Sequence, residues 1–244
     1  MTVGTLTGRR ILVTRALEDA RVWADQLAAL GADAVILPCI HAELFEDSLT
    51  RETLASALRD AAWLCVTSPR GVEAVARLAV PLATELRIAA VGEATASAAR
   101  TLFGREPFVA LGGTSRALGV ELADLLGATI ASTRIVVAAA AGGRSDAEIA
   151  LSREGAIVSR VNVYRTVPAT RGDTVRDLSA EQIDDVLLAS PSAVAGLLNQ
   201  ASVPSSARIF AIGPTTTAAI VAAGLSVTGE AAHPDFESLV EAMQ

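Results

Sequence analysis

The chain contains no lysine: all 20 of its cationic side chains are arginines. A Schiff-base mechanism requires a lysine amine, and so does a nucleotide-binding P-loop of the usual type, so both are excluded. Aromatic residues make up only 3% of the sequence, and the formal net charge is −7. With few rings to stack on bases and no excess of positive charge, a nucleic-acid partner is not expected.

Cysteine and histidine are also scarce. Cys39 and Cys65 lie in apolar, strand-like stretches, which is typical of inert buried thiols. His41 and His233 are the only histidines, and there is no Cys/His cluster, so a metal site of the zinc type is not expected. No apolar run approaches the roughly 18 residues of a membrane helix, and the N-terminus lacks the apolar core of a signal peptide. We therefore expect a soluble, cytoplasmic protein with no membrane partner.

The most informative feature that is present is an internal repeat. Residues 62–102 resemble residues 184–224. In both copies an apolar strand runs into a Ser-Pro turn and a helix, and a second apolar strand runs into a glycine turn and another helix. Such strand–helix alternation predicts parallel sheets of the flavodoxin-like or Rossmann-like α/β kind, with one sheet in each of two similar domains.

The order of the segments predicts how the two domains share the chain. The first strand–helix–strand unit, 10–37, is too small to fold alone, and the part after residue 168 provides three more strand–helix pairs without a starting partner. We therefore expect a discontinuous domain 1, formed by 1–37 and 168–244, and an inserted domain 2, formed by 42–162. The crossings at 38–41 and 163–167 are extended in character and predict a two-stranded β connector that acts as a hinge.

The individual elements follow from apolar spacing and from turn residues. Helices are expected at 18–30, 50–60, 69–79, 93–102, 115–126, 145–154, 191–200, 214–223 and 235–243. Strands are expected at 10–14, 34–37, 63–67, 87–91, 107–110, 134–139, 156–163, 185–189, 208–212 and 225–228.

The repeated turns are candidate ligand sites, because open parallel sheets bind ligands at the carboxyl ends of their strands. Ser68 and Ser190, each followed by proline, also have a purely structural explanation as helix N-caps. Their matching positions favour a second role in binding. The turns that begin at Gly92 and Gly213 allow a ligand to approach the backbone closely. Their threonines add hydroxyls that could donate hydrogen bonds to a carboxylate.

Other candidates carry a positive charge or a proton. The loop Gly142–Arg144 lies between a strand and a helix, but it lacks the spacing of a known phosphate loop. Arg15 follows the first strand and could supply a fixed cation at the same edge of the sheet. A solvated arginine at the start of a helix is the simpler interpretation. Tyr164, the only tyrosine, lies on the connector. It is either a packing residue or the proton donor between the domains, and His41 in the other crossing is an alternative donor.

Taken together, these segments resemble the uroporphyrinogen-III synthase family, and the resemblance spans nearly the whole chain in order. The matching segments are Ile-Leu-Val-Thr-Arg at 11–15, Leu-Gly-Ala-Asp-Ala-Val with Leu-Pro at 30–38, Val-Thr-Ser-Pro-Arg-Gly-Val at 66–72, Ala-Val-Gly-Glu-Ala-Thr-Ala at 90–96, Gly-Gly-Arg at 142–144, Val-Tyr-Arg-Thr-Val-Pro at 163–168, Ala-Ser-Pro-Ser-Ala-Val at 189–194 and Ala-Ile-Gly-Pro-Thr-Thr-Thr at 211–217. Each motif is loose, and their ordered combination is what is specific.

The resemblance implies a cofactor-free lyase that closes hydroxymethylbilane, a linear polycarboxylate tetrapyrrole, with inversion of ring D. It implies Tyr164 as the acid that assists departure of the hydroxyl. Expected partners are the tetrapyrrole and, transiently, the preceding bilane-forming enzyme, with the chain itself a monomer. The candidate binding residues are Arg15, Ser68, Arg70, Gly92, Thr95, Arg144, Ser190, Ser192, Gly213, Thr215 and Thr216.

A non-catalytic module of the same fold, which senses an anion or a tetrapyrrole, is the alternative function. It would share the hinge and the helix-terminus sites. The retained tyrosine and the Thr215–Thr216 pair favour the enzyme.

Overall fold

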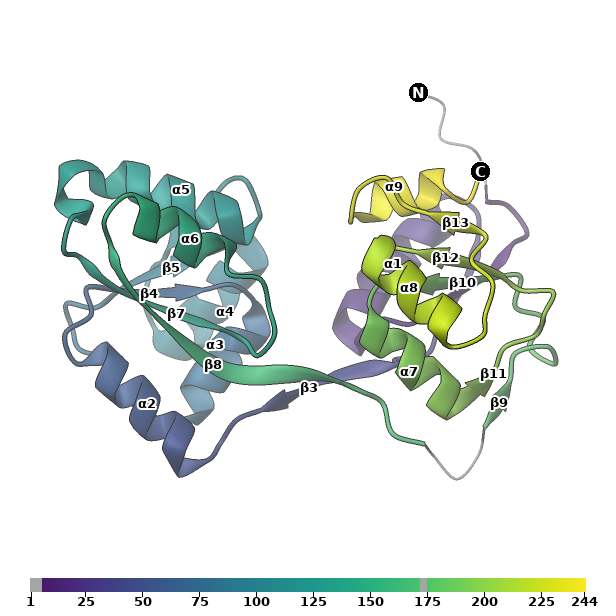
Figure 1. Ribbon diagram of the computed structural model, residues 1–244, viewed down its shortest axis with the longest axis horizontal. Helices are drawn as coiled ribbons and strands as arrows, with labels where there is room; N and C mark the ends of the chain where they lie inside the picture. Colours follow the sequence, from purple (N-terminus) through teal and green to yellow (C-terminus); the bar gives the residue numbers. More distant parts are fainter. Residues whose placement is uncertain (1–5, 172–174) are drawn as a thin grey trace. The chain divides into compact units, whose positions relative to one another are not determined.

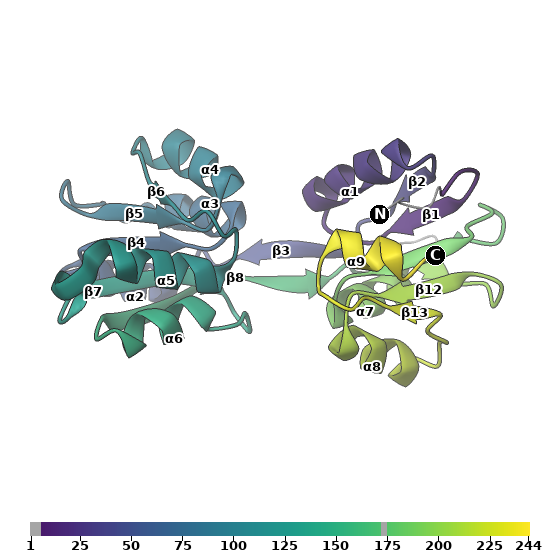
Figure 2. The same ribbon diagram turned by 90° about the horizontal axis from the view of Figure 1, so that it is seen from above.

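The computed structural model describes residues 6–171 and 175–244, and the chain divides into two compact α/β units (Figures 1 and 2). Unit 1 comprises 1–41 and 166–244, and unit 2 comprises 42–165. One division of the chain lies at the end of the predicted connector 38–41, and the other lies within 163–167. None of the helices in the described part of the chain combines the length and the apolar character that crossing a membrane requires.

Unit 1 is built on a five-stranded sheet in the order β13-β12-β10-β1-β2, in which every neighbouring pair is parallel. Its strands are β1 (Arg10–Val13), β2 (Asp33–Ile36), β10 (Asp185–Leu188), β12 (Arg208–Ala211) and β13 (Gly229–Glu230). Helices α1 (Leu17–Ala29) and α9 (Phe236–Glu241) share one apolar cluster with the sheet, and α7 (Pro191–Gln200) and α8 (Pro214–Ala222) share another. The sheet is therefore covered on both faces, which explains its continuous apolar strands.

Unit 2 is built on a six-stranded sheet in the order β3-β8-β7-β4-β5-β6. Its strands are β3 (Ile40–Leu44), β4 (Trp63–Val66), β5 (Arg87–Ala90), β6 (Phe108–Val109), β7 (Arg134–Ala140) and β8 (Ile157–Pro168). Helices α2 (Ser48–Leu58), α3 (Pro69–Arg77) and α4 (Glu93–Phe103) contribute to one core cluster. Helices α5 (Ser115–Leu126) and α6 (Asp146–Arg153), with the short 3-10 helix Gly127–Ile130, contribute to the other.

Close packing of α5 on α6 depends on a glycine. A Cβ added at Gly119 would lie 2.8 Å from the carbonyl oxygen of Ala147 and 2.8 Å from the Cβ of Ala150. No side chain fits there without separation of the two helices. The glycine therefore sets how closely α5 and α6 approach one another.

The two sheets share one strand arrangement, although their chain orders differ. Reading outward from the centre, β10-β12-β13 in unit 1 corresponds to β4-β5-β6 in unit 2, and β1-β2 corresponds to β7-β8. Unit 1 is thus a circular permutation of the unit 2 arrangement, and the chain termini lie where unit 2 has the link from α5 to β7. In each unit the strand order reverses at one point, between β1 and β10 or between β7 and β4, and open α/β sheets bind ligands at such points.

The predicted α/β class with parallel sheets is confirmed, and most predicted elements lie within two residues of the observed ones. The strand predicted at 225–228 is wrong: the paired strand there is β13, at Gly229–Glu230. Thr228 explains the difference, because its hydroxyl accepts the backbone N–H of Ile209 at 3.1 Å in place of a carbonyl. Two short strands that were not predicted, β9 (Arg176–Asp177) and β11 (Ala201–Ser202), pair with one another.

The connecting strands are longer than expected. β8 continues to Pro168, beyond the predicted strand end at 163, and β3 extends to Leu44. The N–H of Phe45 donates to the carbonyl of Val163 at 2.9 Å, and that of Ala169 donates to Cys39 at 2.8 Å. Because residue numbers rise along one segment as they fall along the other, the two segments run antiparallel.

The repeat also shows how one structural position can be stabilised in two ways. At the start of β10, the buried carboxylate of Asp185 pairs with Arg9, at 2.5 Å, and with Arg208 of β12, at 2.9 Å. At the start of β4, Trp63 occupies the position that corresponds to Asp185. The guanidinium of Arg87 in β5 lies 4.4 Å from the centre of the Trp63 ring. An ion pair in unit 1 is thus replaced by a cation–π contact in unit 2.

We predict that Asp185→Asn lowers the free energy of unfolding by about 3 kcal/mol, the low end for breaking a buried ion pair, because both arginines retain partial access to water. Urea denaturation of both proteins measures the difference. Asp33→Asn is the matched control, since its ion pair with Arg10 is exposed, and it should change stability by less than about 0.5 kcal/mol. Equal effects of the two substitutions would contradict the prediction.

Candidate active site

Tyr164 lies buried in unit 2, with 7% of its surface exposed. Its hydroxyl oxygen is 2.9 Å from the hydroxyl of Ser68, and either group can be the donor. Ser68 follows β4, which lies next to β7 in the sheet, and Tyr164 lies in β8, on the other side of β7. The fold therefore brings together two residues that are 96 positions apart in the sequence.

A β-bulge directs Tyr164 toward Ser68. In the pairing of β7 with β8, Ala139 is opposite Asn162, but the next residue, Ala140, is opposite Tyr164. Val163 is the extra residue, so Val163 and Tyr164 are both buried although they are consecutive. Bulges re-aim side chains in this way and are common beside active sites.

Ser68 couples the phenol to a helix N-terminus. It is the N-cap of α3, and its hydroxyl accepts the backbone N–H of Gly71 at 3.0 Å. Pro69 occupies the first helical position, where its fixed φ and missing N–H are tolerated. Because the Ser68 oxygen already accepts the Gly71 N–H, its own proton can be donated to the phenol oxygen, which leaves the phenol proton for a ligand. This arrangement can supply a proton and stabilise the oxygen that loses it.

Helix α4 begins without a side-chain cap. Its N-cap is Gly92, at φ 172°, an extended conformation that any residue adopts. A Cβ added there would meet no atom within 4 Å, so packing does not require glycine either. The first N–H groups of α4 are therefore left for solvent or an anion. Thr95, by contrast, is 2% exposed, so its hydroxyl offers little surface to a ligand.

Unit 1 repeats both turns with nearly identical backbone geometry. Ser190 caps α7 at φ −167° and ψ 158°, beside −165° and 157° for Ser68. Gly213 caps α8 at φ 163°, again with no side-chain cap and with open space around an added Cβ. Thr215 is exposed, whereas Thr216, the counterpart of Thr95, is 1% exposed.

The two serine turns differ in what they bind. The partner of the Ser68 hydroxyl is Tyr164, and that of Ser190 is Ser192, at 3.1 Å. No phenol is available at Ser190, because the chain has a single tyrosine. Only unit 2 therefore presents an acidic proton at its serine turn.

Three arginines complete the predicted set. Arg15 follows β1 at the reversal point of unit 1, where it pairs with Asp19 at 3.2 Å and stacks on Trp23 at 4.5 Å. Arg144 follows β7 at the reversal point of unit 2; its side chain is 77% exposed and pairs with Asp146 at 3.0 Å. The two therefore occupy corresponding positions. Arg70 lies half-buried in the first turn of α3.

His41, the alternative proton donor, is exposed in β3. Within the ranges 6–171 and 175–244, no three histidine, cysteine or acidic side chains are grouped as metal ligands would be. Burial raises the pKa of Cys39 to about 12, and burial together with the nearby Glu148 carboxylate does the same for Cys65. Neither thiol is set up as a nucleophile.

The sequence did not predict two side chains that hold loops at the carboxyl ends of the unit 2 strands, Glu121 and Arg160. The loop after β6 is held by Glu121, whose carboxylate accepts the N–H groups of Leu111, at 2.7 Å, and Gly112, at 3.0 Å. The Arg160 side chain of β8 donates hydrogen bonds to the carbonyl oxygens of Ala140 and Gly143, at the end of β7 and in the loop that follows it. The Gly-Gly-Thr-Ser run at 112–115, between a strand and a helix, could have indicated the loop that Glu121 holds. No local sequence pattern indicates the contacts of Arg160.

Comparison with known proteins agrees with this arrangement. The uroporphyrinogen-III synthase HemD family model matches residues 21–241. The chain belongs to the uroporphyrinogen-III synthase family.

Individual relatives extend the comparison. The uroporphyrinogen-III synthase of Synechococcus elongatus is 30% identical over 171 residues, which cover 66% of this chain and 62% of that protein, so the match spans less than two thirds of the relative's length. A mutant uroporphyrinogen III synthase of Thermus thermophilus has a TM-score of 0.52 at 17% identity, over 97% of both chains. The Helicobacter pylori uroporphyrinogen-III synthetase has a TM-score of 0.53 at 15% identity, over 96% of both chains. These two structures share the fold.

We predict that Ser68→Ala impairs turnover by more than its cost in stability explains. The substitution removes an N-cap, worth about 1 kcal/mol, and also the hydrogen bond to Tyr164. Asp47→Ala is the matched control: Asp47 caps α2 in the same unit, accepts the N–H of Thr50 at 2.9 Å, and has no contact with Tyr164. Thermal denaturation and steady-state assays of both variants should show similar losses of stability, but a loss of rate only for Ser68→Ala.

Proposed function

We propose that this protein converts hydroxymethylbilane into uroporphyrinogen III without a cofactor, by loss of the ring A hydroxyl and closure with inversion of ring D. The observation that carries the proposal is the hydrogen bond between Tyr164 and Ser68 at the ligand-binding edge of a parallel sheet, in a chain of this family. The Synechococcus relative is a uroporphyrinogen-III synthase, which supports the same reaction.

Substrate binding rests on backbone donors more than on excess positive charge. The substrate is rich in carboxylates, whereas the protein has a net charge of −7. Helices α4 and α8 begin at uncapped glycines, and a helix N-terminus favours an anion through its open N–H groups and its dipole. Helix α8 offers fewer N–H groups than α4, because Pro214 has none and the N–H of Thr216 donates to the Gly213 carbonyl at 3.0 Å. We assign Gly92 and Gly213 to this role, with Ser190, Ser192 and Thr215 as hydroxyl donors.

The arginines add fixed cations beside these donors. We assign Arg15, Arg70 and Arg144 to substrate carboxylates, which a guanidinium binds through paired hydrogen bonds. Arg15 and Arg144 support this assignment by lying after the strands at which the order reverses. The buried Thr95 and Thr216 support the first turns of α4 and α8 more than they contact a ligand.

Tyr164 is the proposed acid. The ring A hydroxyl leaves as water and takes the phenol proton, and the resulting phenolate is stabilised by the Ser68 hydroxyl at the N-terminus of α3. Ring D then attacks through its substituted carbon to give a spiro intermediate, which reopens and closes with ring D inverted. Since the free bilane closes unaided to the uninverted isomer, the main task of the protein is to hold ring D away from direct closure.

The remaining assignments follow from this chemistry. The substrate is a water-soluble polyanion, so we place the reaction in the cytoplasm. A bilane that cyclises spontaneously favours rapid transfer, so a transient contact with the enzyme that forms it is the proposed protein partnership. We also propose that the chain works as a monomer.

We predict that Gly92→Ser leaves stability unchanged or slightly higher but weakens binding of uroporphyrinogen III. The backbone at this position accepts any residue, an added Cβ meets no atom within 4 Å, and the serine oxygen would cap α4. Calorimetric titration with product and thermal denaturation measure the two effects. Ser48→Ala, at the first turn of α2, is the control and should alter neither. Unchanged affinity in Gly92→Ser would contradict the use of this helix terminus.

We predict that Tyr164→Phe lowers kcat roughly tenfold to a hundredfold, the lower part of the range for positioned acid catalysis, while isomer III remains the main product. An electron-rich pyrrole already expels the hydroxyl, so the proton assists without being indispensable. The ring is kept, so folding and product affinity should be nearly normal. Separation of isomers I and III by chromatography checks the outcome. A fully active variant would leave the acid role to another donor such as His41, and a switch to isomer I would assign Tyr164 to holding ring D.

A further inference from the structure

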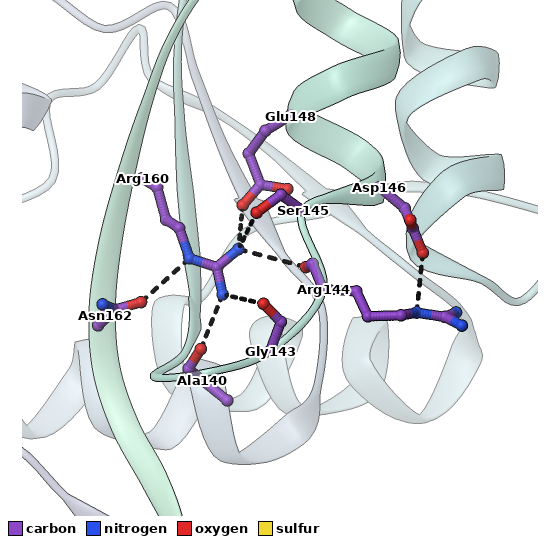
Figure 3. Close-up of polar contacts among 8 residues, drawn as sticks. All are labelled: Ala140, Gly143, Arg144, Ser145, Asp146, Glu148, Arg160 and Asn162. Atoms are coloured by element: carbon purple, nitrogen blue, oxygen red, sulfur yellow. Dashed lines mark hydrogen bonds and ion pairs between the residues drawn. The ribbon is translucent and has the colours of Figure 1, made fainter. Parts of the chain in front are cut away.

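Arg160, a residue of β8 with a 21% exposed side chain, lies beneath residues 141–145, the loop that joins β7 to α6. Its guanidinium donates to the carbonyl oxygens of Ala140 at 2.7 Å, Gly143 at 3.1 Å and Arg144 at 3.2 Å. Figure 3 shows these three carbonyl groups converging on the one side chain. The conformation of the loop is thus tied to Arg160.

The same guanidinium binds two side chains at the start of α6. It donates to the Ser145 hydroxyl at 3.3 Å and pairs with the Glu148 carboxylate, while its Nε donates to Asn162 at 3.0 Å. Ser145 and Glu148 have the spacing of a capping box, in which each would bind a backbone N–H at the helix start. Ser145 nevertheless makes no side-chain cap to α6. Arg160 draws both residues away from that role.

The side chain of Arg144 is directed away from this cluster. It is 77% exposed and pairs with Asp146 at 3.0 Å, and Figure 3 shows it extending to the side opposite Arg160. Its loop follows β7 at the reversal point of unit 2, next to the strand that leads into Ser68. The inward carbonyls and the outward Arg144 are therefore two consequences of one loop conformation.

We propose that Arg160 is a positioning residue, which holds the loop 141–145 so that Arg144 is presented to a carboxylate of the substrate. The inference rests on the proposed function and deepens it. A planar guanidinium with five donors can bind three carbonyls and a carboxylate at once, whereas a lysine ammonium has three donors on a flexible stem. Arg160 itself does not touch the substrate in this arrangement.

The proposal is tested by measuring kcat and KM of the Arg160→Met variant. Loss of the loop conformation weakens substrate binding without removing the acid, so KM should rise roughly tenfold while kcat stays within about twofold. Arg77→Met is the matched control. Arg77 binds Glu73 and Glu46 from an exposed position at the end of α3, away from the loop, and its loss should leave both constants unchanged.

A double-mutant cycle separates positioning from a general structural effect. If Arg160 acts through Arg144, then Arg144→Ala raises KM in the wild-type background and adds little in the Arg160→Met background. Arg160→Lys, which keeps the charge beside Glu148, covers the case in which the methionine variant does not fold. Its KM should lie between those of the wild type and Arg160→Met.

The results that overturn the proposal are distinct from those that overturn the function. A wild-type protein that forms no uroporphyrinogen III overturns the proposed function, and this inference with it. With an active wild type, an unchanged KM in a folded Arg160 variant, or additive effects in the cycle, overturns only the role of Arg160. A fall in kcat at constant KM also overturns it, because Arg160 would then act through Tyr164 on the same strand.

Discussion

Parallel strand pairing is the constraint on which the rest of this structure depends. When all strands of a sheet run one way, their carboxyl ends meet at one edge, and each helix that follows places its N-terminus there. Ser68 and Gly92 of unit 2, and Ser190 and Gly213 of unit 1, occupy that edge for this reason. A protein without lysine and with a net charge of −7 can therefore present anion sites made largely of backbone.

The two units share the geometry of their serine turns but differ in the side chains that these turns meet. The serine caps have nearly the same dihedral angles, yet only Ser68 meets a phenol, because the bulge at Val163 turns Tyr164 inward. The buried starts of the strands diverge in a similar way, with Asp185 in one unit and Trp63 in the other. The strand order fixed where a ligand can bind, and single residues then determined what each edge can do.

Elements with clear local signals were predictable from the sequence, and long-range contacts were not. Helix α5 was expected at 115–126 and is observed there, because Thr114 caps it and Gly127 ends it. The strand expected at 225–228 failed because the side chain of Thr228 takes the place of a backbone partner. The turns of the candidate site could be located from the repeat. The bulge that aims Tyr164 could not, since it depends on a register between β7 and β8 that no local pattern encodes.

The contacts of Arg160 explain why a local capping motif does not predict the start of α6 correctly. Ser145 and Glu148 fit the capping-box pattern, but the partly buried guanidinium of Arg160 competes for both side chains, and the box does not form. An Arg160 guanidinium without these acceptors would leave a partly buried charge unpaired, which costs more than an uncapped helix end, so the cap of α6 does not form. The α6 terminus then stays open beside Arg144, at the edge where α4 also begins without a cap. The open end of α6 is thus a consequence of the charge of Arg160, whereas α4 and α8 are uncapped because glycine occupies the N-cap of each helix.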